Sequence, residues 1–210
     1  MKKQIWLVAT VLLVAASAFG QATAVNTNTV SATLAISATI QSAVFLNLQT
    51  GTTAGIGHCT IAGGAGGAFT MNFLNVDGLG INNGCGNKFA PTTLGQTAAT
   101  YFTDYNIIPA WAGLTETTGT ITAKLGAATP AGVSLVIPTV VDTNSTPGSA
   151  AAFGTTLTTS ATPVVSAGTN GLTEANADGA TFTRFIGLQV SPTATTGSFS
   201  STVTFTLTVQ

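Results

Sequence analysis

The sequence predicts an all-β protein built as an antiparallel β-sandwich, and three observations lead to this fold class. Apolar and small polar residues alternate almost without interruption near both ends of the chain. Between the ends, clusters of Gly, Pro, Asn and Asp separate short runs that have the composition of strands. No segment after the N-terminal leader has a helical period of apolar residues. Many strands divided by turns are typical of a sandwich rather than of a βαβ protein.

The alternation nearest the N-terminus is the longest and predicts a strand over residues 28–48. Nine apolar residues fall on even positions: Val30, Ala32, Leu34, Ile36, Ala38, Ile40, Val44, Leu46 and Leu48. Because successive side chains of a strand point to opposite faces, these residues share one face. The run exceeds the about 5–6 residues of an ordinary strand. The surplus either bends near Gln41 and stays in the chain's own sheets, or pairs with a neighbouring subunit.

The C-terminal alternation predicts a final strand over residues 199–209. Its apolar members alternate with threonines and are Phe199, Val203, Phe205, Leu207 and Val209. Between the two ends, strands are expected over six ranges: 68–76, 99–108, 118–125, 132–141, 153–159 and 181–190. The segments 82–98 and 160–180 lack periodicity and are predicted to be loops. Trp111 lies in a turn-like run from Pro109 to Gly113 and is expected to anchor the core or its rim.

The first 24 residues are interpreted as a secretory signal peptide. Lys2 and Lys3 precede an apolar run from Ile5 to Ala16, and small residues allow cleavage after Gly20 or Ala24. Residues 25–210 are then expected to form one β-sandwich domain. We expect this domain to be exported through the periplasm to the cell surface or medium, and to have no membrane span once the leader is removed.

The low charge of the chain limits its partners. Charged residues are 5% of the sequence, against about 25% in ordinary soluble domains. Without Lys2 and Lys3, three basic residues face six acidic ones, a net charge of −3. The absence of a basic patch argues against nucleic acid as a partner. Few lysines are left to guard exposed sheet edges, so we expect another subunit to cover them.

Cys59 and Cys85 are the only cysteines, and an even number of cysteines in an exported chain predicts a disulfide. Both lie in glycine-rich segments that can bend to meet the geometry of a bridge. His58 is the only histidine and precedes Cys59, but one histidine with scattered acids does not make a metal site. Asp77 near Asn82 and Asn83 is interpreted as a turn rather than a calcium loop.

No residues in the sequence form a recognisable catalytic or cofactor-binding set. The six acids are isolated, whereas a glycosidase needs two carboxylates around one bond. The glycines from Gly63 to Gly67 do not have the spacing of a phosphate-binding loop. We therefore expect a protein without enzymatic activity, metal or cofactor.

The two ends of the chain resemble a known group of exported proteins. The run from Thr29 to Ile40 is similar to the opening strand of bacterial spore coat protein U-type domains. The ending from Thr196 to Gln210 has a glycine, an aromatic two residues later and then alternating Val and Thr. It resembles the last strand of those domains and of chaperone–usher pilins. The resemblance covers about 30 residues at the termini.

This resemblance implies an immunoglobulin-like, pilin-like sandwich that lacks one strand and borrows it from another subunit. Residues 25–40 would then be the donated strand, with Val30, Leu34, Ile36 and Ile40 as its buried side chains. The expected partners are copies of the chain or related subunits, and a periplasmic chaperone. The expected function is that of a structural subunit in a surface filament, pilus or coat.

An alternative function is also consistent with the sequence. A monomeric exported module could bind carbohydrate or a surface through the segments 77–98 and 160–180. In that case residues 28–48 would complete the protein's own sheets, and the chain would not polymerise.

Overall fold

The computed structural model describes residues 35–39, 41–64, 67–91, 97–140, 145–166, 172–173 and 180–210. The chain divides into two units, 1–40 and 41–210. In the first unit, the described residues 35–39 have no regular secondary structure and are exposed. The predicted signal peptide lies outside the described residues. Among the residues that are described, none belongs to a helix with the length and hydropathy of a membrane span.

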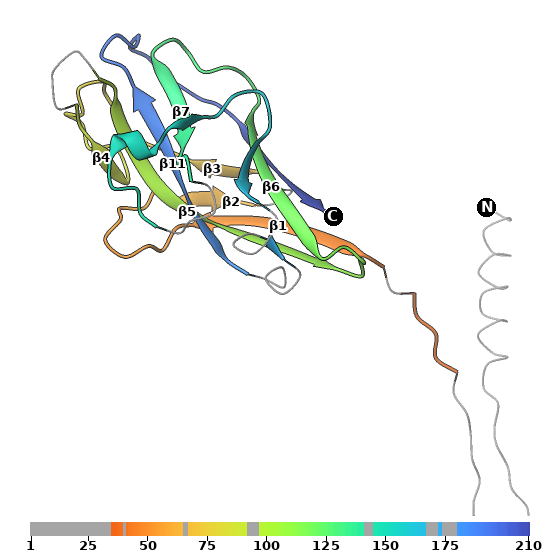
Figure 1. Cartoon of the computed structure of the whole chain (residues 1–210). Coiled ribbons are helices and arrows are strands. Elements are labelled where there is room, and N and C mark those ends of the chain that lie inside the picture. Colours follow the sequence, from red (N-terminus) through yellow and green to blue (C-terminus); the bar gives the residue numbers. More distant parts are fainter. Residues whose placement is uncertain are drawn as a thin grey trace, which may run out of the picture. The chain divides into compact units, whose positions relative to one another are not determined.

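The second unit contains one large antiparallel sheet with the order β1-β5-β11-β7-β8 (Figure 1). A further strand, β4, pairs with residues 100–102 of β5. The same residues of β5 also pair with β11. The bounds of these strands are β1 (Ala43–Thr50), β4 (Asn87–Phe89), β5 (Ala99–Ala112), β7 (Val133–Ile137), β8 (Thr155–Thr156) and β11 (Phe182–Val190).

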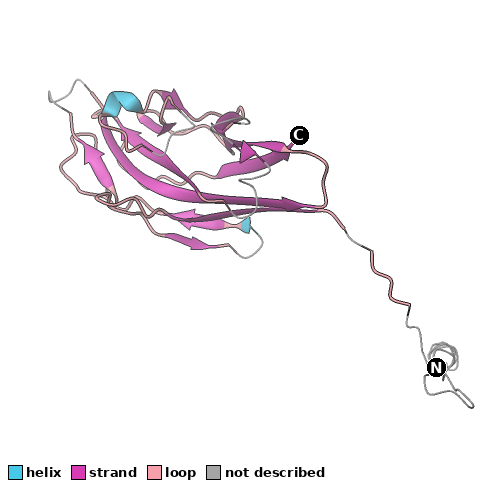
Figure 2. Ribbon diagram, turned by 60° about the horizontal axis from the view of Figure 1, so that its bottom comes forward, coloured by secondary structure: helices cyan, strands magenta, loops and turns pink. Residues whose placement is uncertain are grey.

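A second sheet of four strands packs against the first. Its strand β6 (Thr118–Leu125) pairs with β12 (Val203–Val209) and also with the short strands β9 (Thr162–Val165) and β10 (Leu172–Thr173). A separate hairpin joins β2 (Ile61–Gly63) to β3 (Phe69–Met71). All of these pairings are antiparallel, and described helix is limited to short turns such as η2 (Ala150–Ala152) (Figure 2). The predicted all-β sandwich is confirmed.

The main core lies between the two sheets. The large sheet contributes Tyr101, Tyr105 and Ile107 of β5, and the four-stranded sheet contributes Ile121 of β6 and Val165 of β9, all at most 2% exposed. Burying an aliphatic side chain of this size stabilises a fold by about 1.5–3 kcal/mol. The two sheets are therefore held together mainly by the apolar residues of β5, β6 and their neighbours.

The large sheet is also covered on its other face, which explains the sequence of β5. Nine successive residues, Ala99 to Ile107, are buried, whereas a strand with one solvated face alternates. The second cluster contains Phe102 of β5, Val136 of β7, Phe153 after η2 and Phe185 of β11. The rings of Phe89 and Phe102 stack with centroids 4.8 Å apart. Since both faces are covered, the run 99–108 shows no alternation.

The N-terminal strand prediction is wrong in its bounds. A strand was expected over 28–48, but β1 begins at Ala43, and residues 35–39 are not in a strand. Leu46 and Leu48 of β1 do pack against the main core, as their alternation predicts. Residues 41 and 42 are not in a strand either, because period-two alternation alone cannot supply the partner that a strand needs.

The turn predicted at Pro109–Gly113 is also wrong, although the burial predicted for Trp111 is confirmed. β5 continues to Ala112, with Trp111 opposite Val44 and 6% exposed. The last residue of β5 paired with β11 is Ile107. Pro109 therefore lies where β5 has β1 as its described neighbour, a position where the missing N–H of proline is tolerated.

Two segments predicted to be loops contain short strands. β4 lies within 82–98, and β9 and β10 lie within 160–180. These strands have two to four residues, which is too few to produce a recognisable period.

The predicted disulfide between Cys59 and Cys85 is present, with Cα atoms 5.3 Å apart. Cys59 is fully buried, and its amide donates to Thr103 Oγ1 at 3.0 Å. The bridge joins the segment after β1 to the segment before β4. It thereby fixes two irregular stretches on the edge of β5, between the residues paired with β1 and those paired with β4.

A buried carboxylate holds the same segment. The Asp104 side chain is fully buried, accepts the Thr53 amide at 2.8 Å and lies 2.6 Å from His58 Nδ1. Gly51 packs so closely on this carboxylate that any Cβ there would collide with it. Burial alone would raise the pKa of Asp104, but hydrogen bonds from Thr53 and the contact with His58 outweigh it and lower the pKa below 3.8. The sequence predicted no role for either residue, since they are 46 positions apart.

Replacing both cysteines with serine should destabilise the fold by about 3.5 kcal/mol, if the bridge acts by restricting the unfolded chain over a 26-residue separation. Urea unfolding of the wild type with and without a reductant, beside the double variant, measures this loss. Equal midpoints for oxidised and reduced protein would contradict the prediction.

Asp104→Asn should flatten the acid side of the stability profile. A carboxyl with a lowered folded pKa stabilises the fold fully above its unfolded value of about 3.9, and this contribution is lost as the pH falls through the lower folded pKa. The variant should also be less stable near pH 7 by about 1–3 kcal/mol, because the pairing of buried groups is disturbed. Urea midpoints between pH 2.5 and 7 measure both effects. A variant that keeps the wild-type slope would show that Asp104 does not titrate in this way.

Candidate assembly site

The last strand, β12, has an open edge. It pairs with β6 along its whole length, from Val203 opposite Leu125 to Val209 opposite Gly119. No described strand pairs with its other edge. Such an edge presents unpaired backbone groups to any chain that can adopt an extended conformation.

The register shows which backbone groups face outward. Thr118 and Gln210 exchange two backbone hydrogen bonds, at 3.1 and 2.8 Å. In an antiparallel ladder such pairs alternate with pairs that exchange none. Thr204, Thr206 and Thr208 therefore bond to β6. The amides and carbonyls of the four apolar residues of β12 point to the open edge: Val203, Phe205, Leu207 and Val209.

The side chains of these four residues are only partly buried. They pack against the main core, and the ring of Phe205 lies 5.6 Å from that of Tyr105. Phe199 is also half-buried against this core but lies before β12. On the opposite face of the strand, Thr204, Thr206 and Thr208 are exposed. The predicted C-terminal strand residues thus lie together at a partly exposed edge of the core.

The predicted donor residues lie in the other unit. Ile36 is described and is 83% exposed, the largest exposure among the exposed large apolar residues. Val30, Leu34 and Ile40 lie outside the described residues. Two large apolar residues at the start of β1, Val44 and Phe45, are exposed by 53% and 55%.

A compact loop from Phe73 to Cys85 is the second feature of interest. Its ends are joined by the Cys85 amide, which donates to the Phe73 carbonyl at 3.0 Å. Inside it, the Asp77 carboxylate accepts the amides of Leu79, Ile81 and Asn82 at 2.8, 3.1 and 2.5 Å. Burial would raise the pKa of Asp77, but these hydrogen bonds outweigh it and lower the pKa. Asp77 is thus the organiser of a turn, as interpreted from the sequence.

Lys88 binds several oxygen atoms of this loop. Its ammonium donates to the carbonyls of Gly80, Ile81 and Asn82 and to Asn83 Oδ1, at 2.8 to 3.3 Å. The Tyr101 hydroxyl lies 3.1 Å from the Asp77 carbonyl and 3.2 Å from that of Asn82. The hydrogen bonds of Lys88 and Tyr101 fix the loop to β4 and β5.

The same loop directs aliphatic side chains outward. Leu74, Leu79 and Ile81 are 61%, 37% and 75% exposed. Leu74 also has a φ of 60°, a conformation that is uncommon for a bulky residue, and its amide is held by Asn72 Oδ1 at 2.7 Å. The sequence analysis missed this surface, because isolated leucines and isoleucines in an Asn- and Gly-rich segment have no period.

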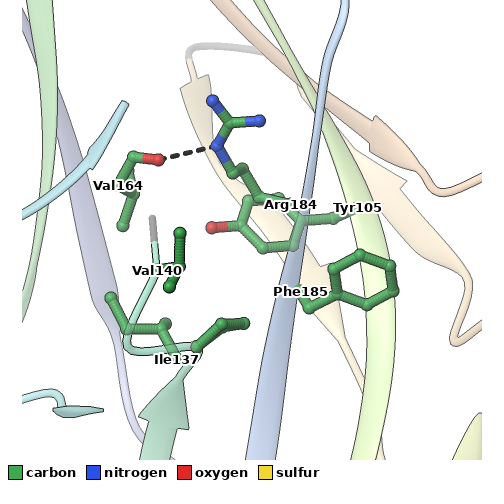
Figure 3. A pocket seen from close by; sticks show the side chains of 7 residues that line it. Tyr105, Ile137, Val140, Val164, Arg184 and Phe185 are labelled. Carbon is green, nitrogen blue, oxygen red and sulfur yellow. Dashed lines mark hydrogen bonds between the residues drawn. The ribbon is translucent and has the colours of Figure 1, made fainter. Parts of the chain in front are cut away.

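One small pocket lies among the described residues. A pocket of ≈ 10 Å³ lies between Tyr105 and Arg184 and is lined by Ile137, Val140 and Val164 (Figure 3), room for about one water molecule. Arg184 Nε donates to the Val164 carbonyl at 2.7 Å there. Within the described ranges, no three His, Cys, Asp or Glu side chains converge as a metal site.

Comparison with known proteins identifies no relative: no family model, curated protein or solved structure matches the chain.

Hydrogen exchange should reveal the open edge residue by residue. In the monomer, the amides of Val203, Phe205, Leu207 and Val209 should exchange much faster than those of Thr204, Thr206 and Thr208, which bond to β6. Amide exchange followed by NMR measures this alternation directly. Equal protection of both sets would mean that the outer edge of β12 is already covered within the monomer.

Proposed function

We propose that this protein is a non-catalytic structural subunit of an exported surface assembly, and that it polymerises by strand exchange at the open edge of β12. The observation that carries the proposal is the combination of outward backbone groups and half-buried side chains on the same four residues of β12. An added strand would satisfy the backbone groups and cover the side chains together.

The segment 25–40 has the pattern that such a strand requires. From Val30 to Ile40 its even positions are apolar and its odd positions are mostly Thr or Ser. Placed beside β12, Val30, Leu34, Ile36 and Ile40 would face the core with Phe205 and Leu207. Thr29, Ser31, Thr33, Ser37 and Thr39 would then continue the exposed threonine face, where cross-strand hydroxyl pairs are favourable.

The energetics favour exchange between subunits over an exposed segment. Ile36 is 83% exposed in the single chain, and burying a large aliphatic side chain contributes about 1.5–3 kcal/mol. Four such residues, together with a ladder of backbone hydrogen bonds, would give a contact that resists dissociation. The signal peptide predicted at residues 1–24 and the low charge of the chain fit an exported protein whose edges are covered by its neighbours.

Charge substitutions on the two faces of segment 25–40 test this proposal. Leu34→Asp and Ile36→Asp should abolish assembly, because a carboxylate would be buried in the core of the neighbouring subunit. Thr33→Asp and Ser37→Asp are matched controls, since the same charge would lie on the exposed face. The measurement is electron microscopy of the unheated exported protein, with a gel that detects oligomers dissociating only on boiling.

The alternative outcome has a clear meaning. If all four variants and the wild type are monodisperse monomers, strand exchange is wrong and the monomeric binding module is supported. Equal loss of assembly in both pairs would contradict the proposed orientation of the donated strand.

A further inference from the structure

We infer that successive copies of this chain also meet through an apolar end-to-end contact, in which the 73–85 loop of one copy receives the start of β1 of the next. This inference rests on the proposed strand exchange. It concerns apolar side chains that exchange alone does not explain: Leu74, Leu79 and Ile81 on the loop, and Val44 and Phe45, which lie on the two opposite faces of β1 at its start.

These two groups of side chains lie at opposite ends of β5. The loop is held by the Tyr101 hydroxyl at Asp77 and Asn82. Val44 is paired with Trp111, ten positions further along the same strand. At a rise of about 3.3 Å per residue the two positions are about 33 Å apart. In Figure 1, β4 lies at one end of the sandwich and the C-terminus at the other. One subunit therefore cannot cover its loop with its own Val44 and Phe45, whereas a second copy placed end to end can.

The loop has the properties of a preformed contact surface. The disulfide, the three amides bound to Asp77 and the four oxygen contacts of Lys88 fix its backbone. Gly78 lies so close to the backbone at Ser191 that it allows no Cβ. Because Asp77 and Lys88 already hold the backbone of the loop, little ordering of the loop would accompany contact with an apolar partner. Exposed apolar surface on a rigid frame marks an interaction site.

The short chain link between the donor segment and β1 indicates that a second copy of this chain covers the loop. Val44 follows the proposed donor residue Ile40 by four positions, a reach of about 13 Å in an extended chain. Residues 191–202 lead from the loop's neighbourhood into β12, so β12 begins at the loop end of the sandwich. A donor strand antiparallel to β12 would end with Ile40 at that end. The start of the donor subunit's β1 would then lie next to Leu74, Leu79 and Ile81.

The contact is heterologous, because different surfaces of identical subunits meet. Contacts of this type repeat without self-closure and produce filaments unless the rotation closes a ring. The end-to-end contact would set the angle between subunits, whereas the exchanged strand provides the strength. The inference also requires antiparallel insertion, since a parallel donor strand would leave Ile40 at the end of β12 near Gln210.

A charge-pair experiment on the exported full-length protein tests the contact. Ile81→Lys and Val44→Glu should each raise the concentration of unassembled protein about ten-fold, because each places an unpaired charge in an apolar contact. The combined variant should return to within about three-fold of the wild type, because the two charges then pair across the contact. Val140→Lys is the matched control, since Val140 is 66% exposed but belongs to neither group of side chains. It should have no effect alone and should not rescue Val44→Glu.

Sedimentation gives the unassembled fraction, thermal melting shows that each variant folds, and boiling-sensitive oligomers on a gel report strand exchange separately. Oligomers that persist while Ile81→Lys assembles like the wild type, or rescue of Val44→Glu by Val140→Lys, would overturn the end-to-end contact alone. A wild type without such oligomers would overturn the proposed function and this inference with it.

Discussion

The burial of β5 on both faces is the constraint on which the rest of the structure depends. This strand of 14 residues pairs with β1, β4 and β11, and it faces the four-stranded sheet on one side and the Phe102 cluster on the other. It also carries Asp104, which fixes the segment after β1, and Tyr101, which fixes the 73–85 loop. The irregular parts of the sandwich are thus positioned by side chains of one strand.

The two sheets differ in how fully their strands are paired and buried. The candidate assembly site lies where pairing and burial are incomplete among the described strands. β5 and β11 are central strands with buried side chains on both faces. β12 closes the second sheet with four half-buried apolar residues and one unpaired edge in the described structure. Because β12 pairs with β6 throughout, its position is fixed before any partner arrives, so a donated strand would meet a preformed edge.

The sequence predicts what depends on local pattern and misses what depends on neighbours. Strands β6 and β12 have clear alternation because each has one core face and one polar face, and the Cys59–Cys85 bridge follows from composition. The extension of β5 through Pro109 depends on where β11 ends. The His58–Asp104 contact joins residues 46 positions apart. The exposure of Leu74, Leu79 and Ile81 depends on the hydrogen bonds by which Asp77 and Lys88 hold the backbone of the 73–85 loop. None of these leaves a period in the sequence.

Four of the few charged residues of this chain hold backbone groups of the fold. Asp77 and Lys88 bind the backbone of one loop, Asp104 binds another, and Arg184 donates to a carbonyl of β9. The surface of β12 is left with threonines, and the end loop with leucine and isoleucine. Soluble β proteins commonly place lysines or prolines at such edges to prevent association. In the described structure, one edge of β12 and the apolar side chains of the end loop are left uncovered, and the proposed association with further copies would cover both.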